Sequence, residues 1–217
     1  MNRSIRLATS ALTACAALLL TACGGSDDDK DNGKIAGADT GTKKSAPSSP
    51  SATADGIDRP EIKLPADMKN TFEGRETGDA VKDAILADSK RRINAVDAAL
   101  ASGDLKHSAI AFYTTDRALI GLSEYAKRAI GKNISWTGTT RYFDRQVTVF
   151  SKTSAAVTYC ADESRSNSKD RKTNKVTKVK TSPDSYVYYN TAVTKNKDGV
   201  WQTRDLSEDR GAQRCQP

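Results

Sequence analysis

The sequence is poor in the residues and motifs on which much enzyme chemistry depends. Histidine occurs once, at His107, and there is no Cys-x-x-Cys pair, so a four-ligand zinc site is not expected. No Gly-x-Ser-x-Gly segment indicates a serine hydrolase, and no glycine-rich loop is placed to hold a phosphate. His107 lies between Lys106 and Ser108, and we expect it to be an exposed surface residue. The sequence therefore predicts no metal, no cofactor and no catalytic residue.

Long hydrophobic runs are also missing, apart from one near the N-terminus. A basic start precedes an apolar run over residues 7–20, which is too short for a membrane span and is typical of a secretory signal. The Leu-Thr-Ala-Cys segment that ends at Cys23 resembles the lipobox of bacterial lipoproteins. This resemblance implies that residues 1–22 are a lipoprotein signal peptide and that Cys23 is acylated, which would hold the protein on the extracytoplasmic face of the cell membrane. The alternative is an ordinary secretory signal with a coincidental cysteine.

Large apolar residues are almost absent from the segment that follows. Residues 23–60 consist mainly of Asp, Gly, Ser, Thr, Ala, Lys and Pro, a composition that buries too little surface to offset the entropy of ordering. We expect this segment to be a disordered tether and residues 61–217 to form one domain. The formal net charge of +7 makes nearby polyanions plausible partners, and an extracytoplasmic location argues against nucleic acid.

Cysteine is scarce, and its placement is informative. Cys15 lies in the predicted signal and Cys23 is the predicted lipidation site, so only Cys160 and Cys215 remain for the domain. In an oxidising compartment these two are expected to form a disulfide. The alternatives are two separate buried thiols or a metal pair.

The hydrophobic pattern changes from a helical to a strand period along the domain. Residues 61–75 read as an extended lead-in. Helices are then predicted from about residue 79 to the Ser102-Gly103 stop, from about 104 to 113, and over 116–130. Short alternating runs follow at residues 136–143, 146–151, 155–161, 175–181, 186–195 and 200–206, with a hairpin turn at 196–199. Helices first and antiparallel strands afterwards predict an α+β domain.

Two sets of motifs resemble known families. The Ala101-Ser102-Gly103-Asp104 turn and the Phe112-Tyr113-Thr114-Thr115-Asp116 segment resemble the connection between the early helices of NTF2-like (cone-shaped α+β) domains. The Gly138–Phe143 and Ala155–Asp162 segments and the closing Arg-Cys-Gln resemble a group of actinobacterial secreted lipoproteins for which no activity is established. The resemblance covers roughly residues 76–217. It implies N-terminal helices packed on a curved antiparallel sheet, and it passes on no chemistry.

An NTF2-like cone also implies a pocket between the helices and the concave sheet face. Enzymes of this superfamily that resemble ketosteroid isomerases use an aspartate base with tyrosine or acid hydrogen-bond donors. Five residues on predicted strands or strand ends offer such groups, although about half must point away from any pocket: Tyr142, Tyr159, Asp162, Tyr186 and Tyr188.

Basic residues are concentrated between residues 165 and 180. Much of this stretch lacks apolar residues, so we expect a mobile loop or a protruding hairpin. Its cations could bind anionic lipid or wall phosphate, or they could protect a sheet edge against aggregation. The candidate polyanion-binding residues are Arg171, Lys172, Lys175 and Lys178.

These observations favour a non-enzymatic, lipid-anchored envelope protein that binds a small ligand or an envelope component. One alternative is an enzyme that uses the pocket for isomerase-type or hydrolase-type chemistry. Another is a structural or regulatory module that docks proteins. Pocket shape discriminates between them, because a filled cone would exclude the first two and an open cavity with an acid at its base would favour catalysis.

Overall fold

The computed structural model describes residues 55–217. The predicted signal peptide (1–22), the lipidation site Cys23 and most of the predicted tether lie outside this part. Within it, no helix is both long enough and apolar enough to cross a membrane.

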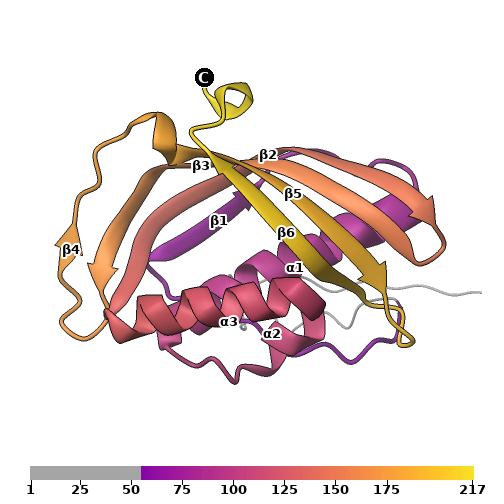
Figure 1. The fold of residues 1–217 in the computed structure, drawn as a ribbon, viewed down its shortest axis with the longest axis horizontal. Helices are drawn as coiled ribbons and strands as arrows, with labels where there is room; N and C mark the ends of the chain where they lie inside the picture. Colours follow the sequence, from indigo (N-terminus) through magenta and orange to yellow (C-terminus); the bar gives the residue numbers. More distant parts are fainter. Residues whose placement is uncertain (1–54) are drawn as a thin grey trace, which may run out of the picture. The chain divides into compact units, whose positions relative to one another are not determined.

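The described residues form one curved sheet with helices packed against it (Figure 1). The sheet order is β1-β2-β3-β5-β6, and a short strand β4 pairs with β3 at the side. The strands are β1 (Met68–Phe72), β2 (Ile134–Ser151), β3 (Ser154–Asp170), β4 (Val176–Thr177), β5 (Tyr186–Lys195) and β6 (Trp201–Arg210). All neighbouring pairs are antiparallel except β1 and β2, which run parallel.

Three helices lie beneath the arch of the sheet: α1 (Ala80–Ser102), α2 (Ser108–Tyr113) and α3 (Asp116–Gly131) (Figure 1). The predicted α+β class, with N-terminal helices on a curved sheet, is confirmed. One detail was wrong, because the sheet is mixed and not purely antiparallel. The lead-in segment forms the extra strand β1. Its five residues are too few for alternation alone to identify a strand.

The ends of α1 follow directly from its sequence. The Asp79 carboxylate accepts hydrogen bonds from the backbone N–H groups of Val81 (2.9 Å) and Lys82 (3.2 Å), which caps the N-terminus. Gly103 ends the helix in the left-handed region, at φ 78°, where a residue without Cβ is favoured. Both boundaries agree with the predicted start and stop.

Strand β2 is one long strand where the sequence predicts two. The expected break around Asp144 is a bulge, with Asp144 at φ 47° and a shift in register between Phe143 and Gln146. A bulge bends a strand and increases its twist without ending its pairing. The chain therefore continues from Ile134 to Ser151 and curves over the helices.

The chain upstream of β1 also packs onto the domain. Ile57 and Ile62 lie against a cluster that includes Tyr113 and Val200. Arg59 forms an ion pair with the buried Asp88 of α1 at 3.2 Å. Packed residues are thus present on both sides of the predicted tether–domain boundary at residue 61.

Cys160 and Cys215 form the predicted disulfide, with their Cα atoms 5.5 Å apart. Both residues are buried, and they pack with Ala212, Tyr186 and Tyr188. The bridge joins β3 to the C-terminal segment, as expected from the cysteine placement.

Candidate functional site

A cavity of about 690 Å³ lies between the inner face of the sheet and helices α1 and α3. Its volume is within the usual range for small-molecule sites, roughly 300–1,000 Å³. The apolar part of its wall comes from Ile93, Val96 and Leu100 of α1, Leu122 of α3 and Trp136 of β2. Tyr125, Ile134 and Val179 also line the cavity and are exposed to solvent, which places them at its mouth. The cone is therefore hollow.

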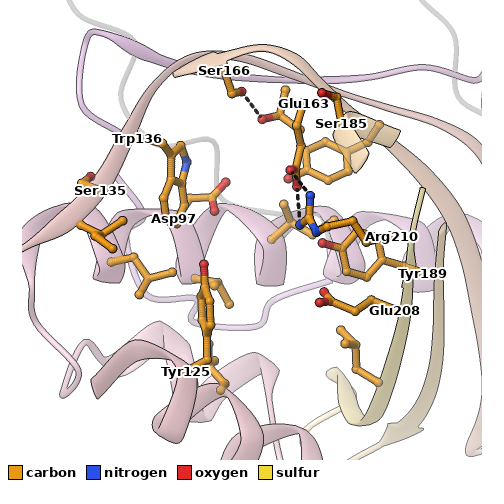
Figure 2. Close-up of a pocket in the computed structure, with 18 of the residues that line it drawn as sticks. Asp97, Tyr125, Ser135, Trp136, Glu163, Ser166, Ser185, Tyr189, Glu208 and Arg210 are labelled. Carbon is orange, nitrogen blue, oxygen red and sulfur yellow. Dashed lines mark hydrogen bonds and ion pairs between the residues drawn. The ribbon is translucent and has the colours of Figure 1, made fainter. Parts of the chain in front are cut away.

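Asp97 of α1 supplies a buried acid to this cavity. Its carboxylate points into the cavity beside Trp136, and the Tyr125 side chain extends towards it from α3 (Figure 2). The residue is 7% exposed, and Asn70 of β1 donates a hydrogen bond to the carboxylate at 2.5 Å. Burial raises the pKa of Asp97 to about 7, although the Asn70 hydrogen bond opposes the rise. Asp97 can therefore gain or lose a proton near neutral pH.

The helical period explains why this acid faces inward. Asp97 lies four residues after Ile93 and three before Leu100, so it shares their face of α1. The apolar face can be recognised from the sequence, but Asp97 was not among the predicted site residues. A carboxylate within an apolar helical stripe is the signal that could have identified it.

Arg92 is the second buried charge in the cavity wall. It is 8% exposed, and within residues 55–217 its guanidinium has no hydrogen bond or ion pair. Its Nε atom is enclosed and without a partner. The positive charge lies near enough to Asp97 and Tyr159 to favour their ionised forms, so the guanidinium is on the cavity side of α1.

Three tyrosines of the sheet face the same space: Tyr142 of β2, Tyr159 of β3 and Tyr189 of β5. Their ring centroids are 6.0 Å apart for Tyr142 and Tyr159 and 5.0 Å apart for Tyr159 and Tyr189. Burial raises the pKa of all three phenols, so they stay neutral at physiological pH. They give the cavity an aromatic floor.

The remaining polar groups of the wall are mostly paired. Arg210 of β6 donates a hydrogen bond to Glu163 of β3 at 2.7 Å, on the side of the cavity away from Trp136 (Figure 2). The Ser166 hydroxyl lies 2.9 Å from that of Thr140. Ser135, at 1% exposure, is the exception, because its hydroxyl is enclosed and has no partner among residues 55–217.

The structure separates the five predicted pocket residues. Tyr142 and Tyr159 line the cavity, whereas Asp162, Tyr186 and Tyr188 do not. Asp162 contacts Arg141 at 3.3 Å, and the two tyrosines pack around the disulfide. Neighbouring side chains of a strand point to opposite faces, so Tyr188 and Tyr189 of β5 cannot share a face.

Arg171, a predicted polyanion-binding residue, contacts the ends of two helices. Its guanidinium donates hydrogen bonds to the backbone carbonyls of Ser102 (3.4 Å) and Ile130 (3.2 Å), at the C-termini of α1 and α3. A cation is favourable there because helix C-termini carry partial negative charge. Gly103 makes room, since a Cβ at that position would lie 1.4 Å from the Arg171 Nη1.

The other predicted cations lie in a hairpin formed by β3 and β4. Lys172, Lys175 and Lys178 are exposed there. The predicted strand over 175–181 is reduced to the two residues of β4. Binding of a polyanion by this hairpin stays a prediction.

His107 has a structural role. It is half-buried, and its Nδ1 accepts a hydrogen bond from the backbone N–H of Ala109 at 3.2 Å, at the start of α2. The expectation of an exposed surface histidine was wrong, because residue 107 is the N-cap of α2 and is half-buried. In the part of the chain that the structure describes, no group of three or more His, Cys, Asp or Glu side chains could hold a metal ion.

No protein-family model and no curated protein matches this chain. Similar solved structures include a ketosteroid isomerase-like protein from Erwinia carotovora atroseptica, with 16% identity and a TM-score of 0.40 over 58% of this chain and 93% of that one. A domain of unknown function with a cystatin-like fold from Nostoc punctiforme has 17% identity and a TM-score of 0.38, over 62% and 79%. The intermembrane space region of the chloroplast protein ARC6 has 12% identity and a TM-score of 0.37, over 63% and 99%. No activity follows from matches at this level.

Proposed function

We propose that this protein is a lipid-anchored, extracytoplasmic binding protein that holds a small, largely apolar ligand in the cavity. The cavity carries the proposal, because a space of about 690 Å³ with an aromatic floor and an exposed apolar mouth is suited to such a ligand. The ligand would displace water from apolar walls, which favours binding by about 25 cal/mol for each Å² of apolar surface that is buried.

Blocking the cavity tests the binding function. Gly121 of α3 lines the cavity, and a Cβ at this position would meet no atom within 4 Å. We expect Gly121→Trp to abolish the fluorescence enhancement of an apolar dye such as 1-anilinonaphthalene-8-sulfonate with little change in stability. Gly131→Trp is the matched control, because Gly131 also lies on α3 in open space and does not line the cavity. Equal dye binding by the wild type and Gly121→Trp would refute the proposal.

The anchor is supported by the lipobox resemblance at Cys23 and is tested separately. Cys23→Ala is expected to release the protein from membranes into the medium. Unchanged partitioning of this variant into a detergent phase would contradict the anchor.

Proton-transfer catalysis is the second candidate, and Asp97 is the observation that favours it. Asp97 lies in a cavity and its pKa is about 7, so its carboxylate is suited to act as a general base near neutral pH. NMR would follow deuterium exchange of the α-protons of a small ketone such as cyclohexanone. The enzyme would be favoured if the protein accelerates this exchange, if the acceleration rises with pH through about 7, and if it is lost in Asp97→Asn. Exchange at the uncatalysed rate would favour binding alone.

A further inference from the structure

The cavity wall holds one buried positive charge that makes no hydrogen bond or ion pair with the described residues. Arg92 is 8% exposed and makes no hydrogen bond or ion pair within residues 55–217. Burying a charge without a partner is costly, and folded proteins normally pair such groups. An unpaired guanidinium in the wall of a ligand-sized cavity points to a partner that comes from outside the chain.

The other charges around the cavity do not need such a partner. Arg210 pairs with Glu163, and Arg117 pairs with Asp205. Arg128, Asp184 and Glu208 are exposed and therefore hydrated. Of the charged residues that line this cavity, the buried ones are Arg92 and Asp97.

Ser135 is a second, independent sign of a missing polar partner. Ser135 is one of the residues around the cavity, and its enclosed hydroxyl lacks a hydrogen bond within the described residues. Buried hydroxyl groups are nearly always paired in folded proteins. An oxyanion entering the cavity can accept hydrogen bonds from a guanidinium, which presents its donors in a fork that matches a carboxylate or a phosphate.

We infer that the ligand is an amphipathic acid, with an apolar body against the aromatic floor and a single carboxylate or phosphate headgroup bound by Arg92. This inference rests on the proposed function and narrows the chemistry of its ligand. Asp97 in its neutral form is a further donor to the same headgroup.

Asp97 links binding to pH. Besides burial, the groups that shift the pKa of Asp97 are Asn70 from β1, Glu163 from β3 and Arg92 on its own helix. Three tyrosines lie close enough for the Asp97 charge to raise their pKa values: Tyr159 of β3, Tyr142 of β2 and Tyr125 of α3. An anionic headgroup adds a negative charge nearby and raises the pKa of Asp97 further, so the complex takes up a proton above pH 7. Affinity is therefore expected to fall as the pH rises from 6 to 8.5.

Calorimetric titration with three probes of equal chain length tests the inference: octanoate, octyl phosphate and octanol. The full chain carrying Cys23→Ser, which removes the acylation site, is suitable for the titrations. We expect at least one of the two anions to bind at least tenfold more tightly than octanol. Arg92→Met is expected to weaken binding of the anion at least tenfold and to leave octanol binding within twofold. Arg204→Met is the matched control, because this exposed arginine of β6 does not line the cavity, and it should change the affinity less than twofold.

Stability separates a binding role from a structural one. If Arg92 serves the ligand, removing an unpaired buried charge should leave the melting temperature of Arg92→Met unchanged or higher. A clear fall in melting temperature, with anion affinity unchanged, would overturn the inference. Octanol binding as tightly as both anions would also overturn it and would leave the proposed function intact, whereas failure of all three probes and of the dye to bind would defeat the proposed function itself.

Discussion

Replacing Asp97 with asparagine is expected to stabilise the protein at alkaline pH. An aspartate in an unfolded chain has a pKa near 3.8, and burial raises the pKa of Asp97 to about 7 in the folded state. Between these two values the folded state holds a proton that the unfolded state has lost. The stability of the wild type therefore falls as the pH rises through this window and is constant above it.

The size of the effect follows from the pKa difference. One pKa unit corresponds to about 1.4 kcal/mol, so the full rise from 3.8 to about 7 corresponds to roughly 4 kcal/mol. The substituted asparagine side chain cannot ionise and would keep the hydrogen bond from Asn70. We therefore expect Asp97→Asn to match the wild type near pH 4 and to exceed its free energy of unfolding by about 2–4 kcal/mol at pH 8.

Urea unfolding followed by circular dichroism between pH 4 and pH 8.5 measures this difference. Asp162→Asn is the matched control, because hydrogen bonds from Ser164 and Arg141 outweigh burial and lower the pKa of Asp162. Ionised Asp162 stabilises the wild type above the pKa that it has in the unfolded chain, and this stabilisation is lost as the pH falls through its pKa in the folded state. Asp162→Asn should therefore be less stable than the wild type at pH 8. A difference between Asp97→Asn and the wild type that does not change with pH would refute the reasoning.

Three further predictions concern residues outside the cavity. Arg171→Ala should lower the free energy of unfolding by about 1–3 kcal/mol, measured by urea titration, because the carbonyl ends of α1 and α3 lose a charged donor. An unchanged midpoint would contradict this helix-capping role. Cys215→Ser should cost up to about 4 kcal/mol, because the bridge closes a loop with a sequence separation of 55, and the difference from the wild type should disappear when both proteins are reduced. Equal stability of the two oxidised proteins would show that the bridge does not constrain the unfolded chain. If the hairpin binds polyanions, binding to vesicles with anionic lipid should weaken steeply with salt and be lost when glutamate replaces Lys172, Lys175 and Lys178.

Much of the fold could be predicted because its signals are local. Asp79 and Gly103 mark the ends of α1, and a run of alternating residues is sufficient to place β5. The disulfide could be predicted by elimination, since only Cys160 and Cys215 remained for the domain. Strand β1 and the continuity of β2 were missed because both depend on which strands pair, and pairing partners are distant in the sequence.

The candidate site was predicted only in part. Tyr142 and Tyr159 were among the candidates, but the sequence offered no means to separate them from Tyr186 and Tyr188, which face the other side of the sheet. The sequence indicated that Arg171 is a free surface cation. Only the tertiary structure shows that it donates hydrogen bonds to the ends of two helices.

The sequence by itself determined the helices and most strands, and it predicts a secreted, lipid-modified chain from a short segment ending at Cys23. Only the tertiary structure decided that the cone is hollow and that Arg92 and Asp97 lie in its wall. The physical reason is that periodicity depends on neighbours along the chain, whereas the proton affinity of Asp97 is the sum of desolvation by several elements, a hydrogen bond from β1 and charges on α1 and β3. Those contributions exist only once the sheet has closed over the helices.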